Sequence, residues 1–184
     1  MAGAWVKLTA PTLEECAEIS DRFHMDIADV RAALDDEESS RINLEDDYTL
    51  ILVDIPSEEM RNNRHSYTTI PLGILIAEDV VITVCAEETA VLRSFVEQRV
   101  RDFSTKKQMR FTYQVLYNAC MVYQSLLRSI DRKRTEIEER IDKNTEDVDL
   151  IDLHELESNL VYFATSLRAN GVVLDRLTRY GRLR

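Results

Sequence analysis

The sequence contains little glycine, proline and cysteine, and each shortage argues against a class of function. Four glycines occur among 184 residues, and neither G-x-G-x-x-G nor G-x-x-x-x-G-K-[ST] is present, so no glycine-rich phosphate loop is expected. The three cysteines, Cys16, Cys85 and Cys120, are far apart and odd in number, which argues against a zinc knuckle or a disulfide framework. Because free cysteine is commonly buried, we expect small buried thiols in a reducing compartment.

Long apolar runs are also absent. The longest, at residues 73–77 and 80–84, are far shorter than the roughly 20 residues that a membrane-spanning helix needs. The N-terminus has no basic region followed by an apolar run, so it does not resemble a signal peptide. These features predict a soluble, intracellular chain.

Acidic residues outnumber basic ones and are unevenly placed. The chain has 34 Asp and Glu against 23 Lys and Arg, a net charge of −11. Residues 1–108 hold the whole excess, with 22 acids and 11 bases, whereas residues 109–184 hold 12 of each. Nucleic-acid binding requires clustered cations and is not expected, whereas an acidic surface attracts cations and basic partners. We predict an acidic globular domain over residues 1–108, followed by a second part over 109–184.

Hydrophobic periodicity predicts mixed helix and strand in the first part. Residues 4–8 are typical of a strand, and Thr12 with Glu15 forms a capping box that starts a helix. Asp26 and Asp29 start a second, short helix that runs through Leu34. Two hairpins are expected, the first from residues 41–45 and 48–55 and the second from 67–77 and 80–85. A polar loop is expected at 57–66 and a helix at 87–103, with Val91, Leu92, Phe95, Val96 and Val100 on one side.

The second part is almost entirely helical in pattern and contains no proline. Two long helices are expected, with a turn at residues 143–145 and Thr145 as a candidate N-cap. The final helix carries apolar residues that alternate steps of three and four, as in a coiled-coil seam. These positions are Leu153, Leu156, Leu160, Phe163, Leu167, Asn170, Leu174 and Leu177.

Two helices of about 35 residues are each about 50 Å long and exceed what a compact domain covers. They must pack antiparallel on each other, on another subunit, or on both. Asn170 with Gly171 is either a polar layer that sets the register or a local helix break, because glycine destabilises a helix interior.

Signals for an enzyme are weak. His24, His65 and His154 lie in different predicted elements, and no G-x-S-x-G motif occurs. His154-Glu155 superficially matches the start of H-E-x-x-H, but Ser158 stands where the second histidine belongs, so we interpret it as a solvated helix face. No catalytic residues are assigned.

Acidic clusters at residues 35–38 and 45–47 have two interpretations. They are either acidic turns and helix ends, or sites for a hard divalent cation, because Mg²⁺ keeps several waters and needs only one or two carboxylates. The EF-hand pattern is absent, so a dedicated calcium loop is not indicated.

Several motifs, taken in order, resemble the cytoplasmic domain of CorA-type magnesium and cobalt transporters. In the first part they are Pro11-Thr12-x-Glu14-Glu15, Ala33-Leu34-Asp35, Ser40-Arg41-Ile42-x-x-Glu45-Asp46-Asp47-Tyr48, Ile51-Leu52-Val53-Asp54-Ile55-Pro56 and Ile82-Thr83-Val84. In the second part they are Leu127-x-x-Ile130-Asp131 and Asn159-Leu160 with Ser166-Leu167. Each motif is short, but their order covers nearly the whole chain.

The resemblance implies an α+β fold, an α/β/α sandwich with a mixed or antiparallel sheet, followed by a long antiparallel helix pair that begins a stalk toward the membrane. Similar proteins are pentameric channels for hydrated Mg²⁺ whose cytoplasmic domains sense Mg²⁺ at subunit interfaces. Acids that face one another repel unless a dication bridges them, which couples cation occupancy to subunit geometry. No turnover chemistry and no tightly bound cofactor are implied.

The sequence departs from this family at the residues that hold the interfacial cation. Arg31 and Ala32 stand where an acidic pair is expected, and Tyr117 stands where a further acid is expected. Asp35 and Asp36, in the acid-rich stretch that follows this pair, are the substitute metal ligands that we predict. The pore signature Gly-Met-Asn does not occur in these residues, so pore residues are not assigned.

We therefore predict the cytosolic regulatory domain of a CorA-like divalent-cation transporter, without catalytic activity. Its expected location is the cytoplasmic face of the cell membrane, held there by a segment outside these residues. Its expected partners are other copies of itself, as a pentamer in the full-length protein, and divalent cations. The alternative is a freestanding soluble protein that oligomerises through its coiled coil. Two apolar runs of about 20 residues further along the reading frame would favour the transporter.

Overall fold

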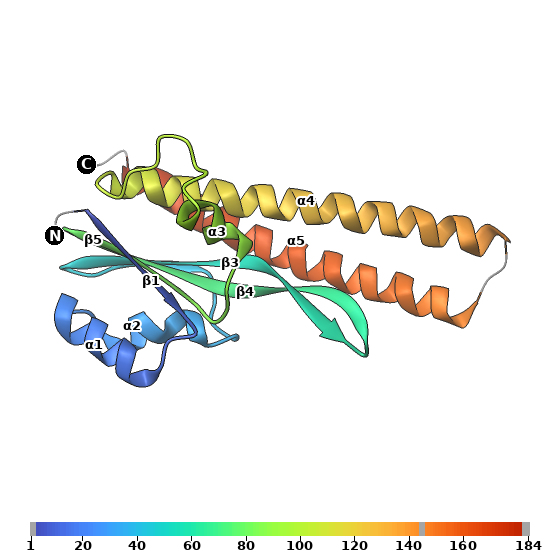
Figure 1. Ribbon diagram of the computed structural model, residues 1–184, viewed down its shortest axis with the longest axis horizontal. Coiled ribbons are helices and arrows are strands. Elements are labelled where there is room, and N and C mark those ends of the chain that lie inside the picture. The colour runs from blue at the N-terminus through green and yellow to red at the C-terminus, as the bar shows by residue number, and fades with distance from the viewer. Residues whose placement is uncertain (1–2, 144–145, 182–184) are drawn as a thin grey trace.

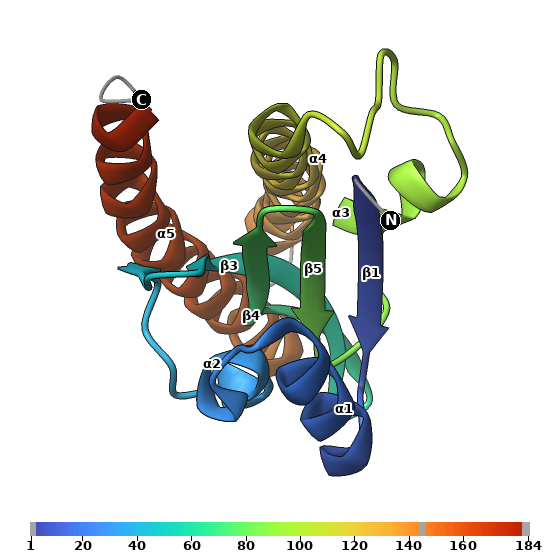
Figure 2. The same ribbon diagram turned by 90° about the vertical axis from the view of Figure 1, so that its left-hand side faces the viewer.

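A computed structural model describes residues 3–143 and 146–181 (Figure 1). The elements are β1 (Ala4–Thr9), α1 (Leu13–Phe23), α2 (Ile27–Arg31), the 3₁₀ turn η1 (Ala32–Leu34), β2 (Arg41–Leu44), β3 (Tyr48–Arg61), β4 (Arg64–Ala77), β5 (Val80–Cys85), α3 (Ala90–Val96), α4 (Gln108–Lys143) and α5 (Asp147–Gly181). Helices α1 and α2 cover one face of the sheet, and α3, α4 and α5 cover the other (Figures 1 and 2). The predicted α/β/α sandwich followed by a long antiparallel helix pair is confirmed.

Five strands form one mixed sheet in the order β1-β5-β4-β3-β2. Strands β2 to β5 are an antiparallel meander, and β1 pairs in parallel with β5, with Val6 opposite Ile82. The two predicted hairpins, β2–β3 and β4–β5, are both present. Strand β5 is buried along its whole length, which explains its continuous apolar run.

The predicted polar loop at residues 57–66 is wrong. Strands β3 and β4 continue through it as a long hairpin arm, with Arg61 paired to Arg64. Asn62 and Asn63 make the turn with φ angles of 51° and 59°, the left-handed conformation that a two-residue hairpin turn requires and that Asn tolerates. The polar composition hid the strands because their partners are polar groups on α5, described below.

Strands β3 and β4 each contain a proline without loss of a ladder hydrogen bond. Pro71 is opposite Asp54, whose N–H bonds outside the ladder, so this pair is not hydrogen-bonded across the strands. Pro56, opposite Thr69, is two residues along β3 and therefore in a pair of the same kind. Proline is tolerated at such outward-facing positions.

The layer of α1 and α2 is built by the predicted caps. Thr12 and Glu15 form both bonds of the capping box, and Asp26 accepts from the N–H of Ala28 to start α2. The predicted helix from Asp26 through Leu34 is split, because η1 tightens its last turn.

Tyr48 of β3 donates to Asp29 at 2.6 Å. Burial and this carboxylate raise the pKa of the Tyr48 phenol to about 12.

The predicted helix at residues 87–103 is shorter than expected and includes only α3. The backbone turns at Gln98 and Asp102, whose φ angles are 55° and 56°, and Val96 is 55% exposed. The turns bring Phe103 back onto Trp5, with ring centroids 6.1 Å apart and edge to face. The chain therefore gives up helix here to complete an aromatic cluster with Phe95 and Phe111.

Helices α4 and α5 are 36 and 35 residues long and run antiparallel beyond the end of the sheet (Figure 1). Gly171 does not break α5, and apart from its chain neighbours and the backbone of its own helix, no atom lies within 4 Å of where its Cβ would be. The predicted N-cap Thr145 falls outside the described residues. No helix in the described part of the chain combines the length and hydropathy that crossing a bilayer requires.

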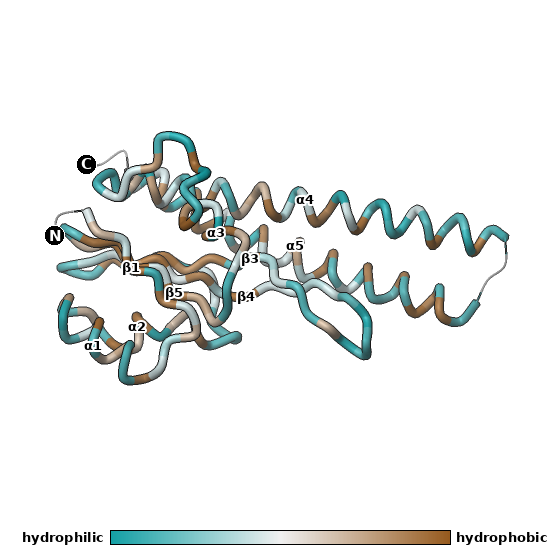
Figure 3. Tube along the Cα trace, in the orientation of Figure 1, coloured by the Kyte–Doolittle hydropathy of each residue, from teal (hydrophilic) through white to brown (hydrophobic). Residues whose placement is uncertain are grey.

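The predicted seam of α5 is only partly right, because this helix packs against two neighbours. Its most buried stripe contains both apolar and polar side chains. The members of the stripe are Leu156, Asn159, Phe163, Ser166, Asn170, Val173 and Leu177. Leu153, Leu167 and Leu174 are partly buried beside the stripe, and Leu160 is 38% exposed. Hydropathy along the chain shows the apolar sheet and the polar ends of the arm and of the helix pair (Figure 3).

Candidate functional site

The predicted metal ligands Asp35 and Asp36 lie on the segment between η1 and β2, and both are exposed. The Asp35 carboxylate accepts from the N–H of Glu37 at 3.0 Å, so it also stabilises the turn. Within residues 3–143 and 146–181, no three His, Cys, Asp or Glu side chains converge in a way that could hold a metal ion. A cation at Asp35 and Asp36 would therefore take its other ligands from water or from a second molecule.

The three residues that stand where the family acids are expected lie on three different elements, α2, η1 and α4. Arg31 is exposed at the end of α2, and Ala32 is buried beside it. Tyr117 lies on α4 and is 67% exposed. None of the three offers a carboxylate, so this chain brings no carboxylate to those positions.

The negative charge is concentrated on the α1–α2 side of the molecule. Residues 12–38, which comprise α1, α2, η1 and the segment after them, contain ten acids and two bases, so they account for −8 of the net charge of −11. Asp35 and Asp36 belong to this segment. The field over this side favours cations without defining a single ligand set.

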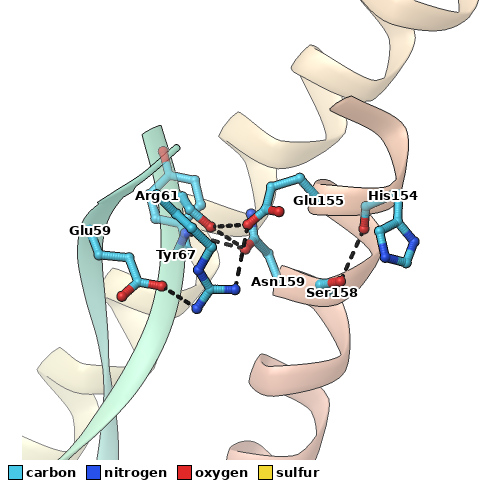
Figure 4. A network of polar contacts seen from close by, with 8 residues as sticks. Glu59, Arg61, Tyr67, His154, Glu155, Ser158 and Asn159 are labelled. Carbon is cyan, nitrogen blue, oxygen red and sulfur yellow. Dashed lines mark hydrogen bonds and ion pairs between the residues drawn. The ribbon is translucent and has the colours of Figure 1, made fainter. Parts of the chain in front are cut away.

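The junction between α5 and the β3–β4 arm is the most extensive polar arrangement in the described residues (Figure 4). At its outer end Arg64 of β4 bonds to Asp152 of α5 at 2.5 Å. One turn further, Glu155 accepts from the hydroxyl of Ser66 at 2.6 Å and lies 3.8 Å from the guanidinium of Arg61. Arg61 is also bound to Glu59 on its own strand at 2.6 Å.

Asn159 occupies the buried centre of this junction and is 1% exposed. Its Oδ1 lies 3.3 Å from the N–H of Tyr67 and 2.9 Å from the Ser66 hydroxyl. Its Nδ2 has no hydrogen-bond partner among the described residues. Tyr67 packs its ring against Phe163 of α5, with centroids 6.2 Å apart, and burial raises the pKa of its phenol.

The junction continues to the point where β2 ends. Ser166 shares a hydrogen bond of 2.7 Å with Thr69 of β4. Asn170 then binds the backbone of Asp54 twice, accepting from its N–H at 2.8 Å and donating to its C=O at 2.7 Å. Because β2 pairs with β3 only as far as Leu52, the amide of Asn170 takes the place of the missing strand.

Asp54 places a carboxyl group inside this junction. Burial raises its pKa, while hydrogen bonds from Ser166 and Ser40 act in the opposite direction. Tyr123 of α4 donates to the Asp54 carbonyl at 2.8 Å, so α4, α5 and β3 meet at one residue. Burial and the nearby Asp54 carboxyl raise the pKa of the Tyr123 phenol.

This arrangement fixes the register of α5 against the sheet. Apolar packing tolerates sliding, whereas directional bonds to backbone groups are lost when the helix shifts by one residue.

The junction contains no nucleophile–base pair, and the His154-Glu155 motif does not act as a unit. His154 is exposed, and Ser158 donates to its carbonyl at 3.1 Å (Figure 4).

The sequence singled out some residues of the junction but did not predict their role in fixing α5 to the sheet. Asn170 was expected in a helix–helix seam, and it contacts the sheet. Asn159 and Ser166 were marked only by resemblance. The available signal was the spacing of Asn159, Ser166 and Asn170, which places three polar side chains on one helical face.

This architecture, a sandwich carrying a long helix pair, is a fold that solved structures of other proteins share. The soluble domain of CorA from Methanocaldococcus jannaschii matches with a TM-score of 0.81 and 24% identity, over 92% of this chain and 68% of that chain. The complete CorA magnesium transporter of the same organism matches with a TM-score of 0.81 and 23% identity, over 95% of this chain and 55% of that one. The ZntB cytoplasmic domain from Vibrio parahaemolyticus shares the fold with a TM-score of 0.68 and 12% identity, over 96% of this chain and 69% of that chain.

The family is shown by sequence. The model of the CorA-like Mg²⁺ transporter protein family matches residues 2–184, and the chain belongs to this family. The cobalt/magnesium transport protein CorA of Methanocaldococcus jannaschii is 24% identical over 179 residues, which are 95% of this chain and 55% of that protein. The chain thus spans about half the length of this curated relative.

Proposed function

We propose that this chain is the cytosolic regulatory domain of a CorA-like divalent-cation transporter and acts without catalysis. The observation that carries the proposal is the family match over residues 2–184, together with the similarity of the fold to that of the CorA soluble domain. Members of this family are transporters. In the described residues a long helix is fixed to a sheet by polar contacts, and this arrangement suits a sensor better than an enzyme. Self-association, with a pentamer in the complete protein, belongs to the same proposal.

The mechanism that we propose is transmission from the sheet to the helix pair. Cation occupancy on the acidic α1–α2 side, with Asp35 and Asp36 among its ligands, changes how copies pack around one another. The polar junction holds α5 in one register, so a movement of the sheet becomes a movement of α5. A helix transmits such a movement only if it is firmly attached to the sheet. The two hydrogen bonds between Asn170 and the backbone of Asp54 provide this attachment.

The test is ion flux through the complete protein that contains this chain, reconstituted in vesicles with Mg²⁺ or Co²⁺ outside and a chosen Mg²⁺ concentration on the domain side. We expect influx that declines as Mg²⁺ on the domain side rises. Asn170→Ala should weaken this dependence, whereas Thr165→Ala, an exposed change on the same helix, should not. Absence of flux of either ion would overturn the transporter assignment. Flux that is insensitive to Mg²⁺ on the domain side would overturn the regulatory role.

A further inference from the structure

A groove opens at the edge of the sheet where α4 begins and α5 ends. Figure 2 views this end and shows the two helices diverging above the strands. The groove has a volume of about 480 Å³, within the range of small-molecule sites. Large apolar side chains in its lining are open to water, with Leu44 52%, Met109 40% and Tyr180 38% exposed. Exposed apolar groups that gather in a hollow are typical of a binding surface.

Acidic side chains of two turns form the rim of this groove. They are Glu45, Asp46 and Asp47 of the β2–β3 turn and Glu78 of the β4–β5 turn, and all four are exposed. No Lys or Arg from the described part of the chain lines the groove, and none of the four carboxylates forms an ion pair with a described residue. The rim therefore favours a cation from outside the described residues.

The sheet fixes the distance between the two turns. Both lie at the same end of the strands, because Tyr48 at the start of β3 pairs with Ala77 at the end of β4. In the strand order β5-β4-β3-β2 the turns are two strand spacings apart, which is roughly 10 Å. Ile76 of β4 lies between them and belongs to the lining. The groove thus offers negative charge at two places with an apolar stretch in between.

Hydrogen bonds to backbone carbonyls hold both turns in place. The N–H of Glu45 donates to the carbonyl of Tyr48 at 2.9 Å and closes the β2–β3 turn. Gln108, the first residue of α4, donates through its side-chain amide to the carbonyls of Ala77 at 2.6 Å and Glu78 at 3.2 Å. The site is therefore preformed, and an occupant binds without first ordering the turns.

We propose that this groove binds a linear aliphatic diamine, with one ammonium group at residues 45–47, the other at Glu78, and the methylene chain on the apolar floor. Such a ligand complements both features of the groove at once. A hydrated Mg²⁺ ion binds carboxylates but gains nothing from apolar groups, and a single ammonium group reaches only one of the two turns. The bound diamine contacts both turns and the ends of α4 and α5, so it stabilises this part of the molecule as a unit.

A length series of diamines tests the proposal by isothermal titration calorimetry on this chain. Diaminooctane is long enough to span both turns, whereas putrescine carries the same two charges on a chain that is too short. We expect diaminooctane to bind on the order of tenfold more tightly than putrescine, because only diaminooctane meets both turns and buries its methylenes. Octylamine, which has the same aliphatic chain with one ammonium group, should bind about as weakly as putrescine. Equal affinities for the two diamines would overturn the proposal, since the general acidic field alone produces that result.

Variants of the rim and of the floor test the placement. Glu78→Gln should weaken diaminooctane binding about threefold, within the range of one exposed ion pair. Met109→Ser should reduce the preference for diaminooctane over putrescine, because it removes apolar lining. Glu14→Gln, an exposed change on α1, removes the same charge away from the groove and should leave the affinity unchanged.

If Glu14→Gln weakens binding as much as Glu78→Gln does, the diamine binds to the acidic surface in general, and the proposal is wrong. Circular dichroism of each variant confirms that the fold is retained, which is expected because all changed positions are exposed. Because the experiment measures no ion flux, its outcome is independent of the transporter assignment.

Discussion

Asn170 closes a two-bond ring with the backbone of Asp54, accepting its N–H at 2.8 Å and donating to its carbonyl at 2.7 Å. The side chain is 9% exposed, so water does not readily replace it. We expect Asn170→Ala to lower the free energy of unfolding by about 1 to 3 kcal/mol, because it leaves the buried N–H of Asp54 without a partner, while the Asp54 carbonyl keeps the bond from Tyr123. Chemical denaturation measures the change, with the exposed Thr165→Ala as control. A loss no larger than in the control would mean that the amide is not needed at this edge.

Local signals predicted much of the fold. The capping box of Thr12 and Glu15 and the hairpins around residues 46–47 and 78–79 depend on neighbours in sequence, and each is present as expected. The unbroken length of α4 and α5 followed from periodicity without proline. The family was recognised from ordered motifs, and its model matches the chain.

The errors arose where partners are distant in sequence. Strands β3 and β4 extend through 57–66 because α5 satisfies their polar groups, and Ser66 lies 93 positions from Asn159. In α5, Ser166 is buried and Leu160 is not, because the helix turns one side to α4 and another to a polar strand. No single-sequence pattern contains that information, so the junction had to be seen in the structure.

The turn at Asn62 and Asn63 provides a test of the long arm. Both residues have positive φ, so Asn63→Val forces a β-branched side chain into a left-handed conformation at a cost of about 1–2 kcal/mol. Asn63→Gly should be neutral or stabilising, since Asn-Gly is the preferred pair for this turn. Urea denaturation of both variants compares them. Equal stabilities would indicate a loop that has no fixed turn.

The ion pair of Arg64 and Asp152 joins the arm to α5, and its side chains are 32% and 22% exposed. A double-mutant cycle with Arg64→Ala and Asp152→Ala should give a coupling energy of about 0.5–1 kcal/mol that falls as salt is added. The matched control is Arg134 with Glu138, a pair within α4 with 45% and 52% exposure, expected at about 0.3–0.5 kcal/mol. A coupling energy of zero would show that this ion pair does not help to hold the arm on α5.

Asp54 should make stability depend on pH in the direction opposite to that of a paired carboxylate. Burial raises its folded-state pKa above the ordinary value of 3.8, so the folded state holds its proton more tightly than the unfolded state does. Asp54 therefore makes its full stabilising contribution when the pH is below 3.8, the ordinary pKa. This contribution is lost as the pH rises through the raised pKa of the folded state. As the pH rises through this range, the free energy of unfolding of Asp54→Asn should increase relative to that of the native chain. The variant should keep this advantage at neutral pH.

The measurement is the difference in unfolding free energy between the two proteins from pH 3.5 to 7, which cancels the other carboxylates. Asp21→Asn, an exposed change on α1, controls for the loss of one negative charge. A difference that stays constant with pH would show that the Asp54 carboxyl does not titrate across the transition described.

Mg²⁺ binding at Asp35 and Asp36 has a direct thermodynamic signature. A cation that binds only the folded state stabilises it by about 2.7 kcal/mol at 100 times its Kd, so the melting temperature should rise with Mg²⁺ above the level given by Na⁺ at equal ionic strength. Asp35→Ala with Asp36→Ala should reduce this rise, because Mg²⁺ binds through one or two carboxylates. Glu14→Ala with Glu18→Ala, both exposed on α1, removes the same charge from the same acidic side. If both double variants reduce the rise equally, the effect comes from the general field of this side. If Asp35 and Asp36 alone matter, the two carboxylates are ligands, and the acidic side holds a defined cation site.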